Sequence, residues 1–252
     1  MFFSLQDKAA FITGGISGIG LAVAQRFIAA GARVVVTDIR DGRDIAAEMG
    51  AMFIQANVAD EAAMARAFTQ AEEAVGKLDI VVNNAGIGDL GPLDAIDAAL
   101  WDKVMRVNVY GVFHGIKHGA RHMNDGGSII NTASQAAFTT MHGFEPYSAS
   151  KSAVVSLTQT AAVELGSRGI RVNAVCPTSI HTPLVPPDDP EFAVTRVFTQ
   201  FGRVGETEDV VGLYHFLAAE ESRFITGQAI LVDGGWTAGL SQAVTEMVAR
   251  CA

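Results

Sequence analysis

Cysteine is scarce in this chain: of 252 residues, only Cys176 and Cys251 are cysteines. Two are too few for a disulfide framework, and Cys176, which precedes a proline, is expected to be a packed small residue. Basic residues are also few, since 18 Lys and Arg stand against 27 Asp and Glu, for a net charge of −9. Without a basic cluster to neutralise phosphates, we expect binding to neither nucleic acid nor an anionic membrane.

Long apolar runs and metal-like histidine clusters are missing as well. No stretch reaches the ~20 apolar residues of a membrane span, and the N-terminus lacks the basic start of a signal peptide. We therefore expect a cytoplasmic protein. Among six histidines, His114 and His118 share the i, i+4 spacing that can chelate zinc, but no carboxylate is obviously placed beside them. We expect this pair at the surface or an interface, and no metal.

Strand-like and helix-like segments alternate from the beginning of the chain to its end. Strands are expected at residues 8–13, 33–37, 51–56, 78–83, 128–133, 170–175 and 229–232, and helices at 18–30, 41–49, 60–75, about 97–123 and 147–167. Unbroken apolar runs such as Val34-Val35-Val36 suit strands covered on both faces. The pattern predicts an α/β fold, with a doubly wound parallel sheet of about seven strands and helices on both faces. No linker or repeat divides residues 1–252, so we expect one domain.

Two segments depart from this alternation. Residues 176–205 hold five of the seven prolines and are expected to form a lid or substrate-binding loop. Residues 237–252 form a tail in which Val244, Met247 and Val248 recur at helical spacing. We expect this tail to cover a subunit contact or to edge the substrate cleft.

A glycine-rich turn, TGGISGIG, follows the first predicted strand and opens the first helix. Gly14, Gly18 and Gly20 allow a tight turn and a close approach of backbone to a pyrophosphate, which the helix N-terminus also favours. Asp38 closes the second strand, where an acid accepts hydrogen bonds from ribose hydroxyls and repels a 2′-phosphate. This favours NAD over NADP, although the nearby Arg40 is able to hold that phosphate.

Tyr147 and Lys151 lie four residues apart on a predicted helix, and therefore on one face. A tyrosine, with a pKa of about 10, is a poor base at neutral pH. A cation ~4–5 Å away would lower that pKa by about two units, so that the phenol exchanges protons near physiological pH. The same spacing is common between neighbours on helix surfaces, so this pair alone does not indicate a catalytic site. The other motifs of the chain are needed to distinguish the two interpretations.

These features together resemble the classical branch of the short-chain dehydrogenase/reductase family over residues 8–235. The motifs that carry the resemblance are the glycine-rich turn, Asn83-Asn84-Ala85-Gly86, Asn108, Ser134, Tyr147-x-x-x-Lys151, Arg171-Val172-Asn173-Ala174-Val175 and Asp233-Gly234-Gly235. Ser134 precedes Tyr147 by thirteen residues, the family's usual spacing. The resemblance implies a Rossmann-like fold.

The resemblance also implies four catalytic residues. Tyr147 would be the general acid/base, and Ser134 would hydrogen-bond the reacting oxygen. Lys151 would lower the pKa of Tyr147 and hold the nicotinamide ribose. Asn108 would bind a water that links Lys151 to solvent.

Cofactor and substrate residues follow in the same way. The NAD-binding candidates are Gly14, Ser17, Gly18, Ile19, Asp38, Ile39, Asn57, Val58, Asn84, Ala85, Gly86, Tyr147, Lys151, Pro177, Ile180 and Thr182. The substrate candidates are Leu90, Gln135, Met141, Phe144, Thr178 and Leu184, with Phe138, His142, Glu145, Val185 and Phe198 as further wall residues. Two positions depart from the family pattern: Asn57 replaces a usual Asp, and Thr178 replaces a frequent glycine at the nicotinamide end of the cleft.

We therefore predict an NAD(H)-dependent oxidoreductase that interconverts a small secondary alcohol, apolar or cyclic, and its ketone. An NADP(H)-dependent ketoreductase and a cofactor-binding protein without turnover are the alternatives. Helices with small and apolar residues around Asn108 and Tyr147, which commonly pair in the family, imply a homo-oligomer, with a tetramer favoured over a dimer. The sequence does not identify the substrate, its stereochemistry or the direction of the reaction.

Overall fold

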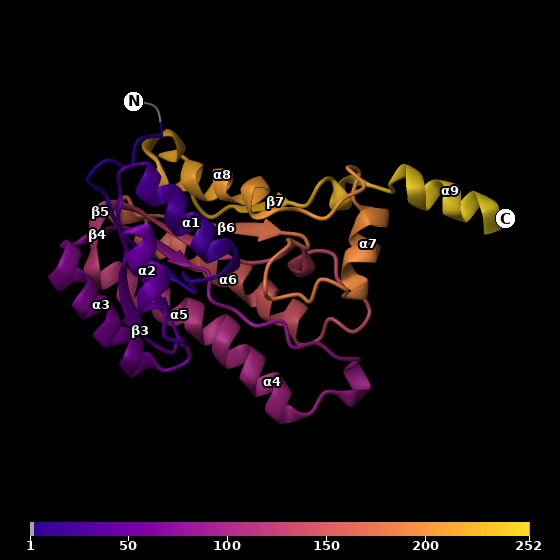
Figure 1. Ribbon diagram of the computed structural model, residues 1–252, viewed down its shortest axis with the longest axis horizontal. Coiled ribbons are helices and arrows are strands. Elements are labelled where there is room, and N and C mark those ends of the chain that lie inside the picture. The colour runs from indigo at the N-terminus through magenta and orange to yellow at the C-terminus, as the bar shows by residue number, and fades with distance from the viewer. Residues whose placement is uncertain (1–2, 252) are drawn as a thin grey trace.

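Seven parallel strands form the centre of the computed structural model, which describes residues 3–251 (Figure 1). The strands are β1 (Ala9–Thr13), β2 (Arg33–Asp38), β3 (Met52–Gln55), β4 (Leu78–Asn83), β5 (Met123–Thr132), β6 (Arg171–Pro177) and β7 (Ala229–Val232). Their order is β3-β2-β1-β4-β5-β6-β7, and each neighbouring pair is parallel. The chain therefore winds outward in both directions from the β1/β4 junction, which confirms the predicted doubly wound sheet.

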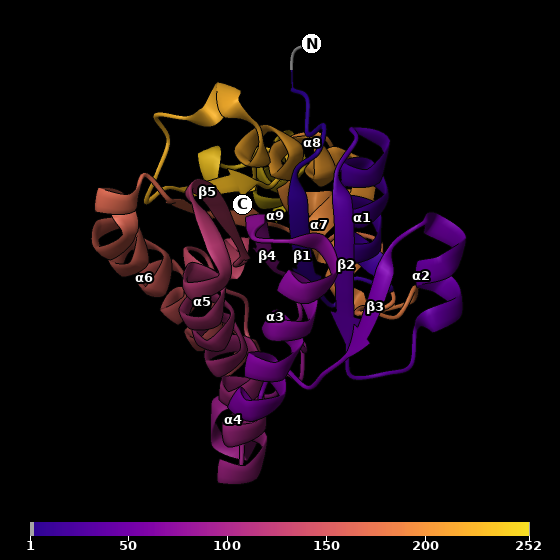
Figure 2. The same cartoon turned by 90° about the vertical axis from the view of Figure 1, so that its left-hand side faces the viewer.

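Helices cover both faces of the sheet. They are α1 (Gly18–Ala29), α2 (Arg43–Met49), α3 (Glu61–Val75), α4 (Ala98–Met105), α5 (Gly111–His122), α6 (Tyr147–Leu165), α7 (Pro190–Phe198), α8 (Thr207–Ala218) and α9 (Gln242–Cys251). One face carries α1, α2 and α8, and the other carries α3, α5 and α6 (Figure 2). Within residues 3–251, no helix combines the length and the apolar character needed to cross a membrane.

Several regions differ from the sequence prediction, and one of them is the start of β5, which lies at Met123 and not at residue 128. The helix expected over about 97–123 is interrupted by a π-helical turn, Arg106–Tyr110, between α4 and α5. The loop expected at 176–205 contains α7, which begins with Asp189 as its N-cap and Pro190 as its first residue. The prediction also lacks α8, although Val210, Tyr214 and Leu217 recur at helical spacing on its buried face.

We expected His114 and His118 at the surface or an interface, and the structure shows that they do not lie at the surface. Both side chains are buried between α5 and α3, at 4% and 5% exposure. The Nδ1 atom of His114 lies 2.8 Å from the carbonyl oxygen of Val58, and the His118 ring stacks on Phe68. A carboxylate also lies closer than expected, because Glu61 is 3.6 Å from His118.

A buried chain of amides ties α6 to the middle of the sheet. Asn83 on β4 donates to the Asn131 oxygen on β5 at 2.8 Å, and Asn131 donates to Thr158 on α6 at 2.9 Å. Helix α5 approaches this chain through Gly115, where an added Cβ atom would lie 1.8 Å from Asn83 Oδ1. Thr158 thereby fixes the middle of α6, the helix that begins with Tyr147, against β5.

Candidate active site

A cavity of about 580 Å³ opens at the carboxyl ends of the strands. Every predicted cofactor and substrate residue lines it, as do Ser134, Tyr147 and Lys151. Asn108 lies behind the wall and is fully buried. Among the further wall candidates, Val185 lines the cavity, whereas His142, Glu145, Phe138 and Phe198 are not among its lining residues. Phe138 is half-exposed, and Phe198 instead stacks on Trp236.

The glycine-rich turn is joined to the loop after β4. Thr13 accepts hydrogen bonds from the backbone N–H groups of Asn84 and Ala85, each at 3.0 Å, and Asn84 donates to the Gly14 oxygen at 3.3 Å. Gly20 packs so closely that an added Cβ atom would lie 2.1 Å from that same oxygen. No side chain caps α1 among the described residues, so its first N–H groups remain available to a phosphate.

Asp38 lies at the far end of the cavity and is 8% exposed. The Arg40 guanidinium donates to both carboxylate oxygens of Asp38, at 3.1 and 3.2 Å, and to the Ser17 hydroxyl at 3.0 Å. These contacts place one carboxylate and one guanidinium side by side at this end of the cavity. The Arg40 side chain itself is 60% exposed.

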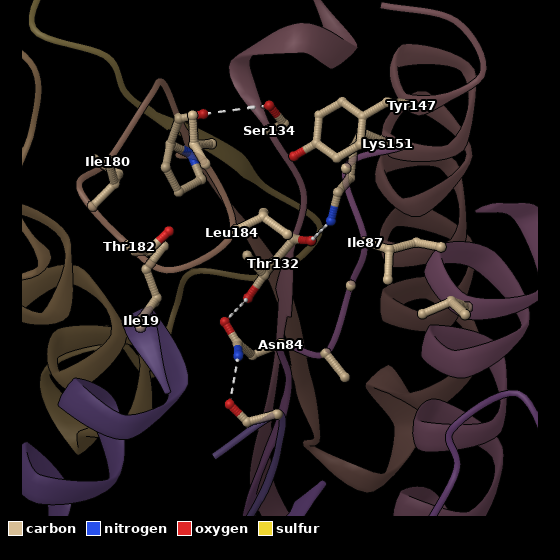
Figure 3. Close-up of a pocket in the computed structure, with 18 of the residues that line it drawn as sticks. Ile19, Asn84, Ile87, Thr132, Ser134, Tyr147, Lys151, Ile180, Thr182 and Leu184 are labelled. Carbon is tan, nitrogen blue, oxygen red and sulfur yellow. Dashed lines mark hydrogen bonds between the residues drawn. The ribbon is translucent and has the colours of Figure 1, made fainter. Parts of the chain in front are cut away.

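Three polar side chains meet near the middle of the cavity. Figure 3 shows Tyr147 and Lys151 facing Ile180 and Thr182 across the pocket, with Ser134 near the phenol. Lys151 is 4% exposed, donates to the carbonyl oxygen of Thr132 at 2.9 Å, and lies 5.5 Å from the centre of the Tyr147 ring.

The electrostatics of this group differ from the sequence prediction. Burial raises the pKa of the Tyr147 phenol to about 12, while a hydrogen bond with Ser134 opposes that rise. Burial also lowers the pKa of the Lys151 ammonium to about 8. In this structure the pKa of Tyr147 therefore lies above its ordinary value and not below it as predicted, because desolvation disfavours the phenolate and Lys151 is not among the groups that shift this pKa.

Asn108 lies in the π-helical turn, Arg106–Tyr110. Its amide nitrogen donates to the Ile87 carbonyl oxygen and to the Ser150 hydroxyl, each at 3.0 Å, and its oxygen accepts from the Ile87 N–H at 2.9 Å. A Cβ atom added at Gly86 would lie 3.2 Å from that oxygen and 3.5 Å from Lys151 Nζ. Asn108 and Lys151 thus border the same small space.

The end of the cavity beyond Tyr147 is mostly apolar. Its wall includes the predicted Leu90, Met141, Phe144 and Leu184. Polar lining residues that sequence reasoning missed include Ser179, Asp189 and Glu191. The run Asp189-Pro190-Glu191 was the available signal, because an N-cap residue followed by proline marks a helix start and places the next acid in its first turn.

Comparison with known proteins agrees with this geometry. The family model described as "Enoyl-(Acyl carrier protein) reductase" matches residues 14–237. Borneol dehydrogenase, mitochondrial, of Lavandula x intermedia is 42% identical over 238 residues, which cover 92% of this chain and 91% of that protein. The NADP-dependent (R)-specific alcohol dehydrogenase of Lentilactobacillus kefiri is 39% identical over 251 residues, covering 93% and 98%.

A solved structure shows the same likeness. A short chain dehydrogenase from Burkholderia cenocepacia J2315 in complex with NADP is 37% identical, covers 92% of this chain and 99% of its own, and has a TM-score of 0.88. The chain therefore belongs to the short-chain dehydrogenase/reductase family. It is an oxidoreductase with a site for a nicotinamide dinucleotide.

Proposed function

We propose that the protein is an NAD(H)-dependent oxidoreductase that interconverts an apolar or cyclic secondary alcohol and its ketone. One observation carries the proposal: Ser134, Tyr147 and Lys151 share one cavity with the glycine-rich turn and Asp38. The uncapped N-terminus of α1 fits the pyrophosphate of a dinucleotide. When bound, the nicotinamide accepts hydride from the alcohol carbon or returns it to the ketone.

Tyr147 moves the proton in this proposal. In the reductive direction its phenol, with a pKa of about 12, is already protonated and donates to the ketone oxygen. In the oxidative direction Tyr147 acts as the phenolate, takes the proton of the alcohol and becomes the neutral phenol. The Lys151 ammonium, with a pKa of about 8, is largely charged at neutral pH and stabilises the phenolate from which that step starts.

Ser134 and Asn108 support that step. The Ser134 hydroxyl donates a hydrogen bond to the reacting oxygen and orients it beside Tyr147. Asn108 uses both amide hydrogens on Ile87 and Ser150, so the second lone pair of its oxygen holds the water that links Lys151 to solvent. Both roles extend the family resemblance to this chain.

The preference for NAD rests on Asp38. Its buried carboxylate accepts hydrogen bonds from ribose hydroxyls and repels a 2′-phosphate. NADP is the second candidate, favoured by the exposed Arg40 beside it and by the NADP named for two of the similar proteins.

We also propose a homo-oligomer, with a tetramer favoured. Apolar side chains on the helices near Asn108 and Tyr147 support it: Val163 on α6 is 83% exposed, and Tyr110 and Phe113 are 54% and 42% exposed. Such exposed apolar groups are typical of a face that packs against a partner.

Replacing Tyr147 by phenylalanine tests the reaction. We expect Tyr147→Phe to lower kcat by at least about 100-fold, because it removes the proton-transferring group. Binding of NADH, measured by fluorescence titration, should change little. The matched control is Tyr110→Phe, since Tyr110 is exposed and lies outside the lining of the cavity.

A panel of secondary alcohols assayed by NADH absorbance provides the readout for this test. Turnover that survives in Tyr147→Phe would refute the acid/base role. Absence of turnover in the unmodified protein, with cofactor bound, would instead favour the non-catalytic alternative.

A further inference from the structure

The carboxyl group of Glu191 has no role in the mechanism above, although it shares the cavity with Tyr147 and Ser134. Glu191 is the second residue of α7, inside the segment expected as a substrate loop. Its charge contributes to the raised pKa of Tyr147, so the two groups are within electrostatic reach of each other. A charged group at that position bears on which substrates the enzyme accepts.

Buried hydroxyl groups hold Glu191 in a fixed orientation. Ser179, 7% exposed, donates a hydrogen bond to Glu191 Oε1. The fully buried Thr195 lies 2.7 Å from the Ser179 oxygen and 2.9 Å from the Glu191 carbonyl oxygen. The Asp189 side chain accepts from the Glu191 N–H at 2.8 Å. A group positioned by such a supporting network is preorganised for recognition.

The second carboxylate oxygen of Glu191 has no such partner. No hydrogen bond from residues 3–251 reaches Oε2, and Oε1 already takes the Ser179 hydroxyl. The basic side chains that line the cavity are engaged elsewhere: Arg40 with Asp38, Lys103 with Asp89, and Lys151 with Thr132. Burial raises the pKa of the Glu191 carboxyl. An acceptor in partly apolar surroundings is stabilised by a hydrogen-bond donor from a ligand.

We propose that Glu191 determines substrate specificity by accepting a hydrogen bond from a second hydroxyl group of a neutral substrate. The same carboxylate disfavours substrates that carry a carboxylate at that end. The inference rests on the proposed function and deepens it: the substrate class becomes neutral diols whose second hydroxyl lies across the ring or chain from the reacting carbon. The apolar wall of Leu90, Met141 and Phe144 then holds the carbon skeleton.

Three kinds of ring alcohol test this proposal. The probes are the isomeric cyclohexanediols, cyclohexanol, and 3- and 4-hydroxycyclohexanecarboxylate, each compared by kcat/KM with NAD. We expect at least one diol to exceed cyclohexanol about tenfold or more, because a site built for a hydroxyl rejects the analogue that lacks it. The hydroxy acids should be the poorest substrates.

Two variants separate hydrogen bonding from charge. Glu191→Gln keeps an acceptor and loses the charge, so the diol to cyclohexanol ratio should stay within about threefold while the hydroxy acids improve about tenfold. Glu191→Leu removes the acceptor and should bring that ratio close to one. Asp188→Asn is the matched control, because Asp188 is an exposed acid of the same segment outside the lining of the cavity.

The possible results distinguish a failure of the Glu191 proposal from a failure of the proposed function. If the unmodified enzyme oxidises secondary alcohols without preferring a diol, or Glu191→Gln leaves the hydroxy acids unimproved, this inference falls and the proposed function stands. If none of the alcohols is oxidised, both fall. Should Glu191→Leu fail to fold, as judged by NADH binding, the isosteric Glu191→Gln still gives the charge-dependent result.

Discussion

At the scale of single residues, the chemistry of the site depends on the exact placement of a few side chains. Asp38 is an example: it is nearly buried, yet both of its oxygens face Arg40. The cofactor choice therefore depends on whether Arg40 stays with Asp38 or turns to a 2′-phosphate. The intact pair favours NAD, since a second negative charge placed beside Asp38 costs several kcal/mol.

The cofactor prediction follows from that balance. We expect kcat/KM for NAD to exceed that for NADP by about tenfold or more, and Asp38→Ser to shift the ratio toward NADP by about tenfold or more, since Arg40 is then released. Steady-state kinetics with both cofactors measure this. Adding Arg40→Ala to Asp38→Ser is the control and should remove the gain. A clear NADP preference in the unmodified enzyme would contradict our interpretation of Asp38.

At the scale of elements, the position of α6 depends on how closely α5 approaches β4. Gly115→Ala would place a methyl group 1.8 Å from Asn83 Oδ1, and Asn83 holds the chain through Asn131 to Thr158. We expect a loss of about 2 kcal/mol or more in the free energy of unfolding, from overpacking and a broken buried hydrogen bond. Chemical denaturation measures it.

The matched control is a helical glycine with open space around it. Gly212 in α8 is exposed and has no atom within 4 Å of an added Cβ. Gly212→Ala should raise stability by about 0.5–1 kcal/mol. If Gly115→Ala were as stable as Gly212→Ala, the close approach of α5 would not be what fixes α6.

Periodicity predicted most of these elements and little of their detail. Apolar runs indicated all seven strands, but β5 begins at Met123, before its apolar run, and Asn124 and Asp125 in that first part are exposed. The π-helical turn at 106–110 has no local signal, because it is stabilised by the contacts of Asn108 with Ile87 and Ser150, far along the chain. The pKa of Tyr147 was not predictable from the sequence either. It depends on the burial of the phenol, which the four-residue spacing to Lys151 does not reveal.

At the scale of the whole molecule, α9 extends from the body beyond α7 (Figure 1). Val244 is 6% exposed and Ser241 donates to the Val197 oxygen of α7, whereas Met247 and Val248 are about half-exposed. One side of the tail thus supports the helix that carries Glu191, and the other presents apolar groups. We propose that the first side serves the substrate cleft and the second a subunit contact.

Deleting residues 240–252 tests both roles at once. We expect KM for the alcohol to rise several-fold while KM for NAD is unchanged, because α7 loses its support far from the glycine-rich turn, and we expect a smaller assembly by light scattering. The double variant Met247→Ser, Val248→Ser separates the two effects, since it keeps Ser241 and Val244. It should reduce the assembly and spare KM. A deletion that alters neither quantity would leave the tail without either role.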